Sequence, residues 1–209
     1  MYYLRMNMTK EEISKINCIV SAPVDLNSIW RETHRLILRP LSLEDLQDIH
    51  EISSQDEVAQ MSGWQCCETP EMSEKRLKHD IEDRETVAVV LKENCKVIGT
   101  ISLQKRPWYL YPIDRSLKGW EFGFDLNKDY WGRGPMPEAV QELMDYCFET
   151  WGYDFLTAGH FQDNIQSKRA IEKCGFQFLF EDDRELPSGK VYHIYTYIKY
   201  NPRKEIKHV

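Results

Sequence analysis

The chain has 209 residues, of which 42% are hydrophobic and 29% charged, and its formal net charge is −7. This length and composition exclude a disordered chain and predict a globular one that buries a core without disulfides or a structural metal. An acidic chain repels phosphate backbones, so we expect no nucleic acid partner, while the excess of carboxylates suits a cationic substrate such as an amine.

Targeting and metal signals are missing from the sequence. Met1–Arg5 is not followed by the sustained apolar run of a secretory leader, and no stretch reaches the ~18 consecutive apolar residues of a membrane span. The cysteines form no C-x-x-C pair, and no histidine pair has zinc-ligand spacing. We therefore expect a protein of the reduced cytoplasm with no membrane partner and no metal.

Three parts of the chain differ in character. Residues 1–32 do not resemble the rest of the chain and are predicted to be an N-terminal extension. Residues 33–200 carry the regular patterns of one domain, and residues 201–209 form a polar tail.

The sequence pattern in the first half of the domain predicts a strand, two helices and a hairpin. Arg35–Pro40 is a strand that ends at proline, and the helical spacing from Leu43 to Ile52 comes after a weak capping box at Ser42 and Asp45. A second helix begins after Pro70. The β-branched runs Thr86–Leu91 and Lys96–Leu103 then favour a hairpin around Glu93 and Asn94.

The second half alternates strands with helices. Trp120–Leu126 alternates apolar side chains with Glu121, Gly123 and Asp125, so these three share one face of a strand. A helix with one apolar stripe comes next. The remaining elements are a strand, a helix that stops at Gly175 and a closing hairpin, predicted over Tyr153–Gly159, Asn164–Cys174, Phe176–Phe180 and Val191–Tyr200. This order implies a mixed α/β (α+β) sheet with helices on both faces.

The most informative segment is Trp131–Met136, at the start of the helix after Trp120–Leu126. Gly132 and Gly134 let the backbone turn tightly, and the helix N-terminus adds the positive end of a dipole, so the segment suits a phosphate or pyrophosphate. Arg133 can add a charge-assisted bond. The segment is not a P-loop and lacks the third glycine of a dinucleotide fingerprint.

Three segments in register resemble one family. Glu121–Phe124 with Tyr130–Val140 resembles the acetyl-CoA motif of GNAT acetyltransferases. Arg35–Leu41 resembles the opening strand of the branch that includes ribosomal-protein N-terminal acetyltransferases, and Asn164–Phe176 resembles its second cofactor motif. The resemblance covers about Thr33 to Ile198. It implies a GNAT-type, mostly antiparallel sheet with one splayed pair of parallel strands, Trp120–Leu126 and Tyr153–Gly159.

The resemblance further implies direct transfer of an acetyl group from acetyl-CoA to an amine, with the cofactor in the gap between the splayed strands. A backbone amide of the splayed strand would polarise the thioester carbonyl. Pro135 and Pro137 depart from the usual pattern, because each removes one N–H from the phosphate turn. The implied cofactor-binding residues are Phe124, Leu126, Trp131, Gly132, Arg133, Gly134, Met136, Asn164 and Ser167.

Two residues are candidates for catalysis. Glu121 is our candidate general base, acting through a water; the alternative is a solvated or salt-bridged strand residue. Ser167 matches a position that donates a proton or hydrogen bond to the CoA sulfur in relatives; the alternative is a first-turn residue bonding its own backbone. Asn164 suits a contact with the pantetheine arm of the cofactor, but its first assignment is that of a helix N-cap, and the two roles are compatible. His160 fits a second base or a packed histidine.

Acceptor-binding residues are expected in two loops. Trp108 and Tyr111 carry aromatic side chains that suit an acceptor pocket or, equally, a homodimer contact. Trp64 lies where this fold receives its acceptor, by analogy. The acceptor itself stays open between a protein N-terminus and a small-molecule amine. The alternative function is an inactive acyl-CoA-binding domain that acts as a sensor or scaffold.

Overall fold

A computed structural model of the chain describes residues 24–104, 111–114, 116–186 and 189–205. Its helices and strands follow the predicted order, with a two-residue strand, β1, and a third early helix, α3, in addition. In chain order they are β1 (Arg31–Glu32), β2 (Leu36–Pro40), η1 (Leu43–Asp45), α2 (Leu46–Ser53), α3 (Asp56–Ser62), α4 (Pro70–Asp83), β3 (Thr86–Leu91), β4 (Lys96–Gln104), β5 (Gly119–Leu126), η3 (Lys128–Tyr130), α5 (Pro135–Thr150), β6 (Phe155–Phe161), α6 (Ile165–Lys173), β7 (Gln177–Glu185) and β8 (Val191–Tyr200).

The strands form one mixed sheet, in the order β1-β2-β3-β4-β5-β6-β8-β7. All neighbouring pairs are antiparallel except β5 and β6, which are parallel. The predicted fold class is therefore confirmed, including the hairpin between β3 and β4.

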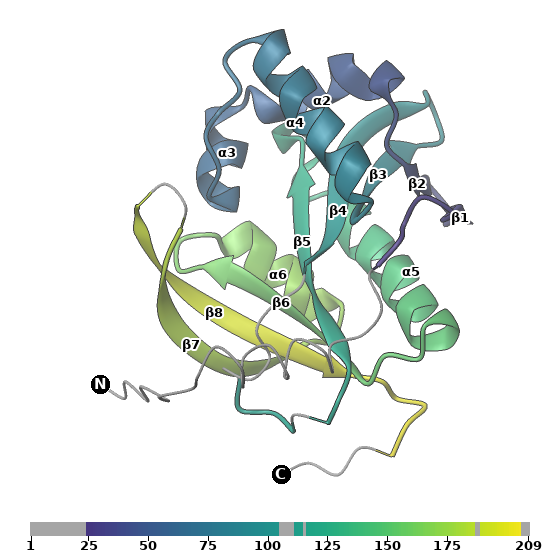
Figure 1. The fold of residues 1–209 in the computed structure, drawn as a ribbon, viewed down its shortest axis with the longest axis vertical. Helices are drawn as coiled ribbons and strands as arrows, with labels where there is room; N and C mark the ends of the chain where they lie inside the picture. Colours follow the sequence, from purple (N-terminus) through teal and green to yellow (C-terminus); the bar gives the residue numbers. More distant parts are fainter. Residues whose placement is uncertain (1–23, 105–110, 115, 187–188, 206–209) are drawn as a thin grey trace.

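The parallel pair separates part of the way along. β5 and β6 pair over four residues, from Gly119 with Phe155 to Phe122 with Ala158. Beyond Phe122, β5 stays paired with β4, and beyond Ala158, β6 stays paired with β8. The two halves of the sheet therefore diverge, as the different directions of β5 and β6 show in Figure 1. We call the opening between these strands the fork.

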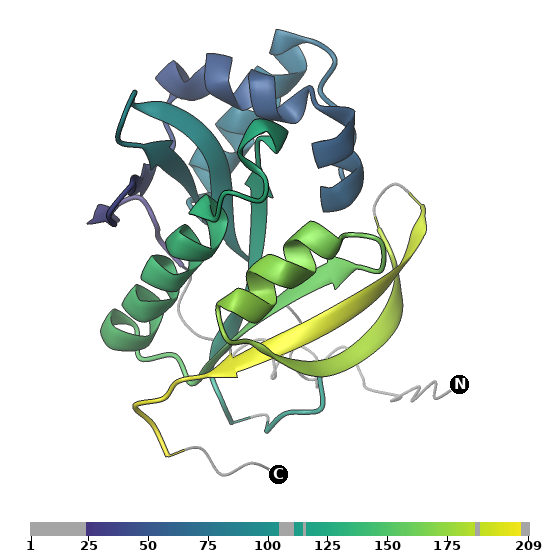
Figure 2. The same cartoon turned by 180° about the vertical axis from the view of Figure 1, so that it is seen from behind.

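Helices cover both faces. α5 and α6 lie on the face seen in Figure 2, where the predicted apolar stripe of α5, from Ala139 to Phe148, joins the larger core with Trp120 and Phe122. On the other side, α2 and α4 close a smaller core around Leu77 and Val97. The larger core also takes in Val24, Leu26 and Ile29, which precede β1.

Three details differ from the sequence prediction. A third helix, α3, lies between the two predicted early helices, and only Val58 and Ala59 among its residues are buried. β6 begins and ends two residues later than predicted. β7 extends to Glu185, because the long strand β8 pairs with its polar end as well as with its apolar start.

Within the described residues, no helix is both long and apolar enough to cross a bilayer. No three histidine, cysteine or carboxylate side chains among these residues are grouped to hold a metal ion. Cys147 and Cys174 are buried in the larger core, as small apolar residues are.

Candidate active site

The turn before α5 has the geometry of an anion site. Gly132 and Gly134 have φ angles of +73° and +82°, in the left-handed region that favours glycine. Gly134 is the N-cap of α5, and Pro135 occupies its first position, where the missing N–H costs no intrahelical bond. The Trp131 and Arg133 amides donate to the carbonyls of Lys128 and Tyr130, so what the turn offers an anion is the positive end of the dipole of a 16-residue helix and its two glycine amides. We call Trp131–Gly134 the phosphate turn.

One brace holds the phosphate turn from the residues just before β2. The Arg35 guanidinium donates to the Arg133 carbonyl oxygen at 3.1 Å and to Glu138 Oε2 at 2.7 Å. Glu138, in the first turn of α5, also accepts from the Arg35 amide and the Thr33 hydroxyl. These hydrogen bonds lower the pKa of the Glu138 carboxyl against the opposing effect of burial. The carboxylate thus joins the start of α5 to the segment that leads into β2.

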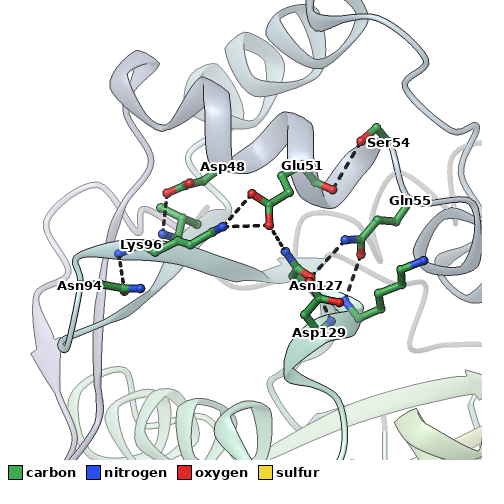
Figure 3. Close-up of polar contacts among 10 residues, drawn as sticks. Asp48, Glu51, Ser54, Gln55, Asn94, Lys96, Asn127 and Asp129 are labelled. Carbon is green, nitrogen blue, oxygen red and sulfur yellow. Dashed lines mark hydrogen bonds and ion pairs between the residues drawn. The ribbon is translucent and has the colours of Figure 1, made fainter.

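A second brace lies before the turn and is centred on Asn127, which is fully buried. Figure 3 shows its side chain between α2 and η3. Asn127 Nδ2 donates to Glu51 Oε1 at 2.8 Å, and its Oδ1 accepts from Gln55 Nε2 at 3.1 Å and from the Asp129 amide at 3.0 Å. Lys96 neutralises Glu51 with contacts of 2.8 and 2.7 Å. We call the side chains of Glu51, Gln55, Lys96 and Asn127 the Asn127 clamp.

The phosphate turn opens into a cavity of about 200 Å³, which we call the cofactor cavity. It extends from the phosphate turn, along the part of β5 that does not pair with β6, to α6. Eight of the nine cofactor-binding residues predicted from sequence line it: Phe124, Leu126, Trp131, Gly132, Gly134, Met136, Asn164 and Ser167. Arg133 is not among the described lining residues. Its amide donates to the Tyr130 carbonyl at 3.4 Å and its guanidinium lies 5.7 Å from the centre of the Tyr130 ring.

A second cavity, of about 520 Å³, lies across the fork, and we call it the acceptor cavity. Its floor is the polar face of the sheet, to which strand alternation brings Thr100, Ser102 and Gln104 from β4 beside Glu121 and Asp125 from β5. The two cavities share six lining residues: Met61, Ser62, Phe124, Asp125, Asn164 and Ser167. The two cavities are therefore neighbours at the fork.

Glu121 lies on this floor and is 5% exposed. The Tyr111 hydroxyl donates to its Oε2 at 2.7 Å, and Tyr111 packs edge-on against Phe180 of β7. Arg184, another lining residue, lies 5.9 Å from the centre of the Tyr111 ring and donates to Asp182 and to Thr196. Glu121 is thus a buried carboxylate in a polar network and not a solvated strand residue, while the salt-bridged form of the alternative stays open beside the role of general base.

Ser167 stands where the cavities meet, since it lines both. Its amide donates to Asn164 Oδ1 at 3.0 Å, so Asn164 caps α6 as predicted. Asn164 Nδ2 also donates to the Met61 carbonyl at 2.9 Å, which ties the end of α3 to the start of α6 across the fork.

The roof of the acceptor cavity comes from α4 and the loop before it. Trp64 lines the cavity, and the Arg76 guanidinium stacks 4.0 Å from the centre of its ring. Asp125 accepts from Arg76 Nη2 at 2.7 Å and from Trp64 Nε1 at 3.4 Å. The described lining holds two guanidinium groups against five carboxylates, Asp80, Asp83, Glu85, Glu121 and Asp125, a net charge of −3 when histidine is neutral.

The remaining sequence predictions fare differently. Tyr111 contacts Glu121 and is not among the described residues that line the acceptor cavity; Trp108 lies outside the described residues. Sequence reasoning missed Arg76, Arg184 and Asn127. For Asp125 a signal existed, because strand alternation already places it on the face of Glu121.

Comparisons with known proteins agree with this geometry. The acetyltransferase (GNAT) domain family matches residues 35–177. The chain is 27% identical to an uncharacterized N-acetyltransferase, p20, of Bacillus licheniformis over 79% of this chain and 92% of that one. It is 30% identical to the uncharacterized N-acetyltransferase YoaA of Bacillus subtilis over 70% of this chain and 81% of that one.

Among solved structures, a ribosomal-protein-S5-alanine acetyltransferase from Vibrio fischeri shares the fold, with a TM-score of 0.66 and 21% identity over 86% of this chain and all of that one. The family match covers more than half of the chain and includes the fork, the phosphate turn and α6. The chain therefore belongs to the GNAT family of acetyltransferases, enzymes that use acetyl-CoA as the acetyl donor.

Proposed function

We propose that this protein transfers an acetyl group from acetyl-CoA directly to an amine held in the acceptor cavity, with Glu121 as general base and Ser167 as proton donor. The observation that carries the proposal is the meeting of the two cavities at the fork, with Glu121 on the acceptor side and Ser167 in both linings. Direct transfer needs such a junction, because no covalent enzyme intermediate carries the acetyl group across.

The proton and electron balance assigns each residue a step. A water passes the proton of the ammonium group to Glu121, and the free nitrogen lone pair attacks the thioester carbonyl carbon. The C–N bond forms as the C–S bond breaks, and Ser167 supplies a proton to the leaving thiolate. A backbone amide in the free part of β5, between Gly123 and Leu126, would stabilise the oxyanion.

Charge supports a cationic acceptor. Five carboxylates against two guanidinium groups in the described lining favour an ammonium group over an anionic substrate. The acceptor is a protein N-terminus or a small-molecule amine. The structural relative named for alanine acetylation of a ribosomal protein supports the first, and the acetyl-CoA donor is common to both.

The test is release of CoA thiol from acetyl-CoA with three groups of amines: short peptides with free N-termini, polyamines and aminoglycoside-type compounds. We expect amine-dependent release, lowered by Ser167→Ala and unchanged by Ser116→Ala, an exposed serine that lines neither cavity. Full turnover of Ser167→Ala would remove Ser167 from the mechanism.

The alternative is an acyl-CoA-binding domain without turnover, favoured by Pro135 and Pro137 in the first turn of α5. Calorimetric binding of acetyl-CoA with no thiol release from any of the three groups would support it. Thiol release with any one group rejects it.

A further inference from the structure

Two cationic side chains of α6 line the cofactor cavity and have no counter-ion in the described part of the chain. Arg169 and Lys173 are four residues apart, so they lie on one face of the helix, and both line the cavity. Both are exposed, and neither side chain forms an ion pair or hydrogen bond with a described residue. Lys168 differs, because it lies 3.9 Å from Glu172 and is not among the described lining residues.

The charge of the cofactor cavity is opposite in sign to that of the acceptor cavity. Its described lining holds the two cations of α6 against one carboxylate, Asp125, a net charge of +1, whereas the acceptor cavity has −3. Asp125 already accepts from Arg76 Nη2 at 2.7 Å, so it does not neutralise Arg169 or Lys173. In a chain of net charge −7, this local positive charge favours an anionic group of the ligand.

The position of α6 brings these cations toward the start of α5. Cys174, the residue after Lys173, donates from its Sγ to the Pro137 carbonyl oxygen in the first turn of α5 at 3.5 Å. At the other end of α6, Ser167 stands where the two cavities meet. α6 therefore extends from the fork to the neighbourhood of the phosphate turn, on the same face of the sheet as α5 (Figure 2).

We propose that Arg169 and Lys173 bind the 3′-phosphate of acetyl-CoA. The inference rests on the proposed function, because it takes this cavity to be the site of acetyl-CoA. CoA carries a diphosphate, which suits the phosphate turn, and a separate phosphate on the 3′ oxygen of the adjoining ribose. That phosphate has a charge of about −1.5 to −2 at neutral pH and supplies the anion that both side chains lack.

The direction of the cofactor agrees with this assignment. With the thiol end at Ser167 and the diphosphate at the phosphate turn, the ribose lies beyond the turn, away from the fork. Lys173 lies at that end of α6, and Arg169 reaches the same face from one turn earlier. The two side chains thus give the protein a preference for acetyl-CoA over acetyl donors that lack the 3′-phosphate, such as acetyl-dephospho-CoA and acetyl-pantetheine.

The test is a comparison of CoA with dephospho-CoA, which differs only in the 3′-phosphate, by calorimetry. We expect the wild-type protein to bind CoA about tenfold more tightly, and the double variant Arg169→Gln, Lys173→Gln to prefer it less than about twofold. Affinity for dephospho-CoA should be the same in both proteins. Lys75→Gln is the control, since Lys75 is an exposed lysine of α4 that lines neither cavity. Glutamine is a good helix former, so the exposed face of α6 tolerates the changes.

The outcomes separate this inference from the proposed function, because binding needs no turnover. Equal losses of affinity for both ligands in the double variant would assign the two cations to the diphosphate and overturn the proposal. An unchanged preference for CoA would make them solvated surface residues and overturn it as well. Failure of the wild-type protein to bind either ligand would also contradict the proposed function. Because both side chains are exposed, the preference for CoA should shrink between about 0.1 M and about 1 M salt, and a preference that salt leaves unchanged contradicts the assignment.

Discussion

The surroundings of the phosphate turn and the acceptor cavity differ in how fully their polar groups are paired. Around the turn, the carboxylate of Glu138 and the side-chain amide of Asn127 each make several hydrogen bonds. In the described part of the chain, three buried side-chain nitrogen or oxygen atoms have no hydrogen-bond partner. Arg76 Nη1 and His160 Nε2 belong to residues lining the acceptor cavity, and Thr157 Oγ1 belongs to the residue paired with Glu121 across the parallel strands.

This difference indicates two kinds of preparation for a ligand. A turn that is held by hydrogen bonds from neighbouring side chains is rigid before acetyl-CoA binds. Less conformational entropy is therefore lost when the cofactor binds. Buried polar atoms without hydrogen-bond partners carry a free-energy cost, so the surroundings of the acceptor cavity are less fully stabilised before binding than those of the turn. Four substitutions test this comparison.

The largest effect is expected at the acceptor cavity. Glu121→Gln keeps the size of the side chain and removes the base, so kcat should fall by about 10²-fold or more while the KM of acetyl-CoA stays the same. Steady-state kinetics measures both. Glu93→Gln, in the exposed turn between β3 and β4, is the control with the same loss of charge. Unchanged kcat and an unchanged pH–rate profile in Glu121→Gln would exclude this base.

The next effect tests the phosphate turn. A side chain at Gly132 meets no atom within 4 Å, so Gly132→Ala introduces backbone strain alone, worth about 1–2 kcal/mol at φ +73°. The free variant should relieve this strain by leaving the φ > 0 conformation that the bound cofactor needs, so acetyl-CoA binding should weaken about tenfold by calorimetry. Gly189→Ala is a matched control, because Gly189 has φ +77°, open space and a place in the distant β7–β8 hairpin. Equal acetyl-CoA affinities in the two variants would show that the turn does not bind the cofactor.

A smaller effect is expected from the partner of the base. Tyr111→Phe removes the hydroxyl that donates to Glu121 Oε2, and a hydrogen bond to a carboxylate contributes about 1.5–3 kcal/mol. Only part of this acts on the transition state, so we expect kcat to fall about threefold to tenfold, with an altered pH–rate profile. Tyr146→Phe on α5 is the control, since Tyr146 lines neither cavity. A fall in stability without a change in the pH profile would make Tyr111 structural only.

The smallest effect concerns stability. Burial raises the pKa of Asp80, which means that ionising this carboxyl opposes folding. Stability is lost as the pH rises from the ordinary aspartate pKa of the unfolded chain toward the raised pKa of the folded state, and the full cost is present at neutral pH. Asp80→Asn should therefore raise Tm by about 2 °C at neutral pH and by less in acid. Asp83 is an exposed carboxylate on the same helix, so Asp83→Asn should leave Tm unchanged. Equal Tm shifts in the two variants would contradict the view that burial of Asp80 opposes folding.

What could be predicted from sequence depended on how local the pattern is. The strand alternation around Glu121, the glycines of the phosphate turn and the apolar stripe of α5 are each contained in a few neighbouring residues, and the structure has all three. α3 escaped prediction because its seven residues bury only Val58 and Ala59, too few for a helical period. Its position is set by distant partners.

The same limit applies to the site. Arg76 reaches Asp125 from 49 positions away, and Asn127 meets Glu51 across 76 positions, so no spacing rule could join them. An aromatic residue in a loop predicts that Tyr111 contacts the substrate or a second copy of the chain, but it does not indicate the bond that its hydroxyl donates to Glu121. Side-chain type indicates where the candidate active site is, and tertiary contacts determine which groups each side chain meets there.

The Asn127 clamp has a consequence for changing the acceptor preference of this protein. Glu51 and Gln55 belong to the helical segment that leads into α3, yet both hold the loop in front of the phosphate turn. Exchanging that whole segment for one from a relative would remove the hydrogen bonds that hold the loop before the phosphate turn. It would change the acceptor cavity at the same time. A graft that starts at Asp56 and stops before the α4 cap, Thr69, would replace the cavity residues Met61, Ser62 and Trp64 while leaving both anchoring side chains in place.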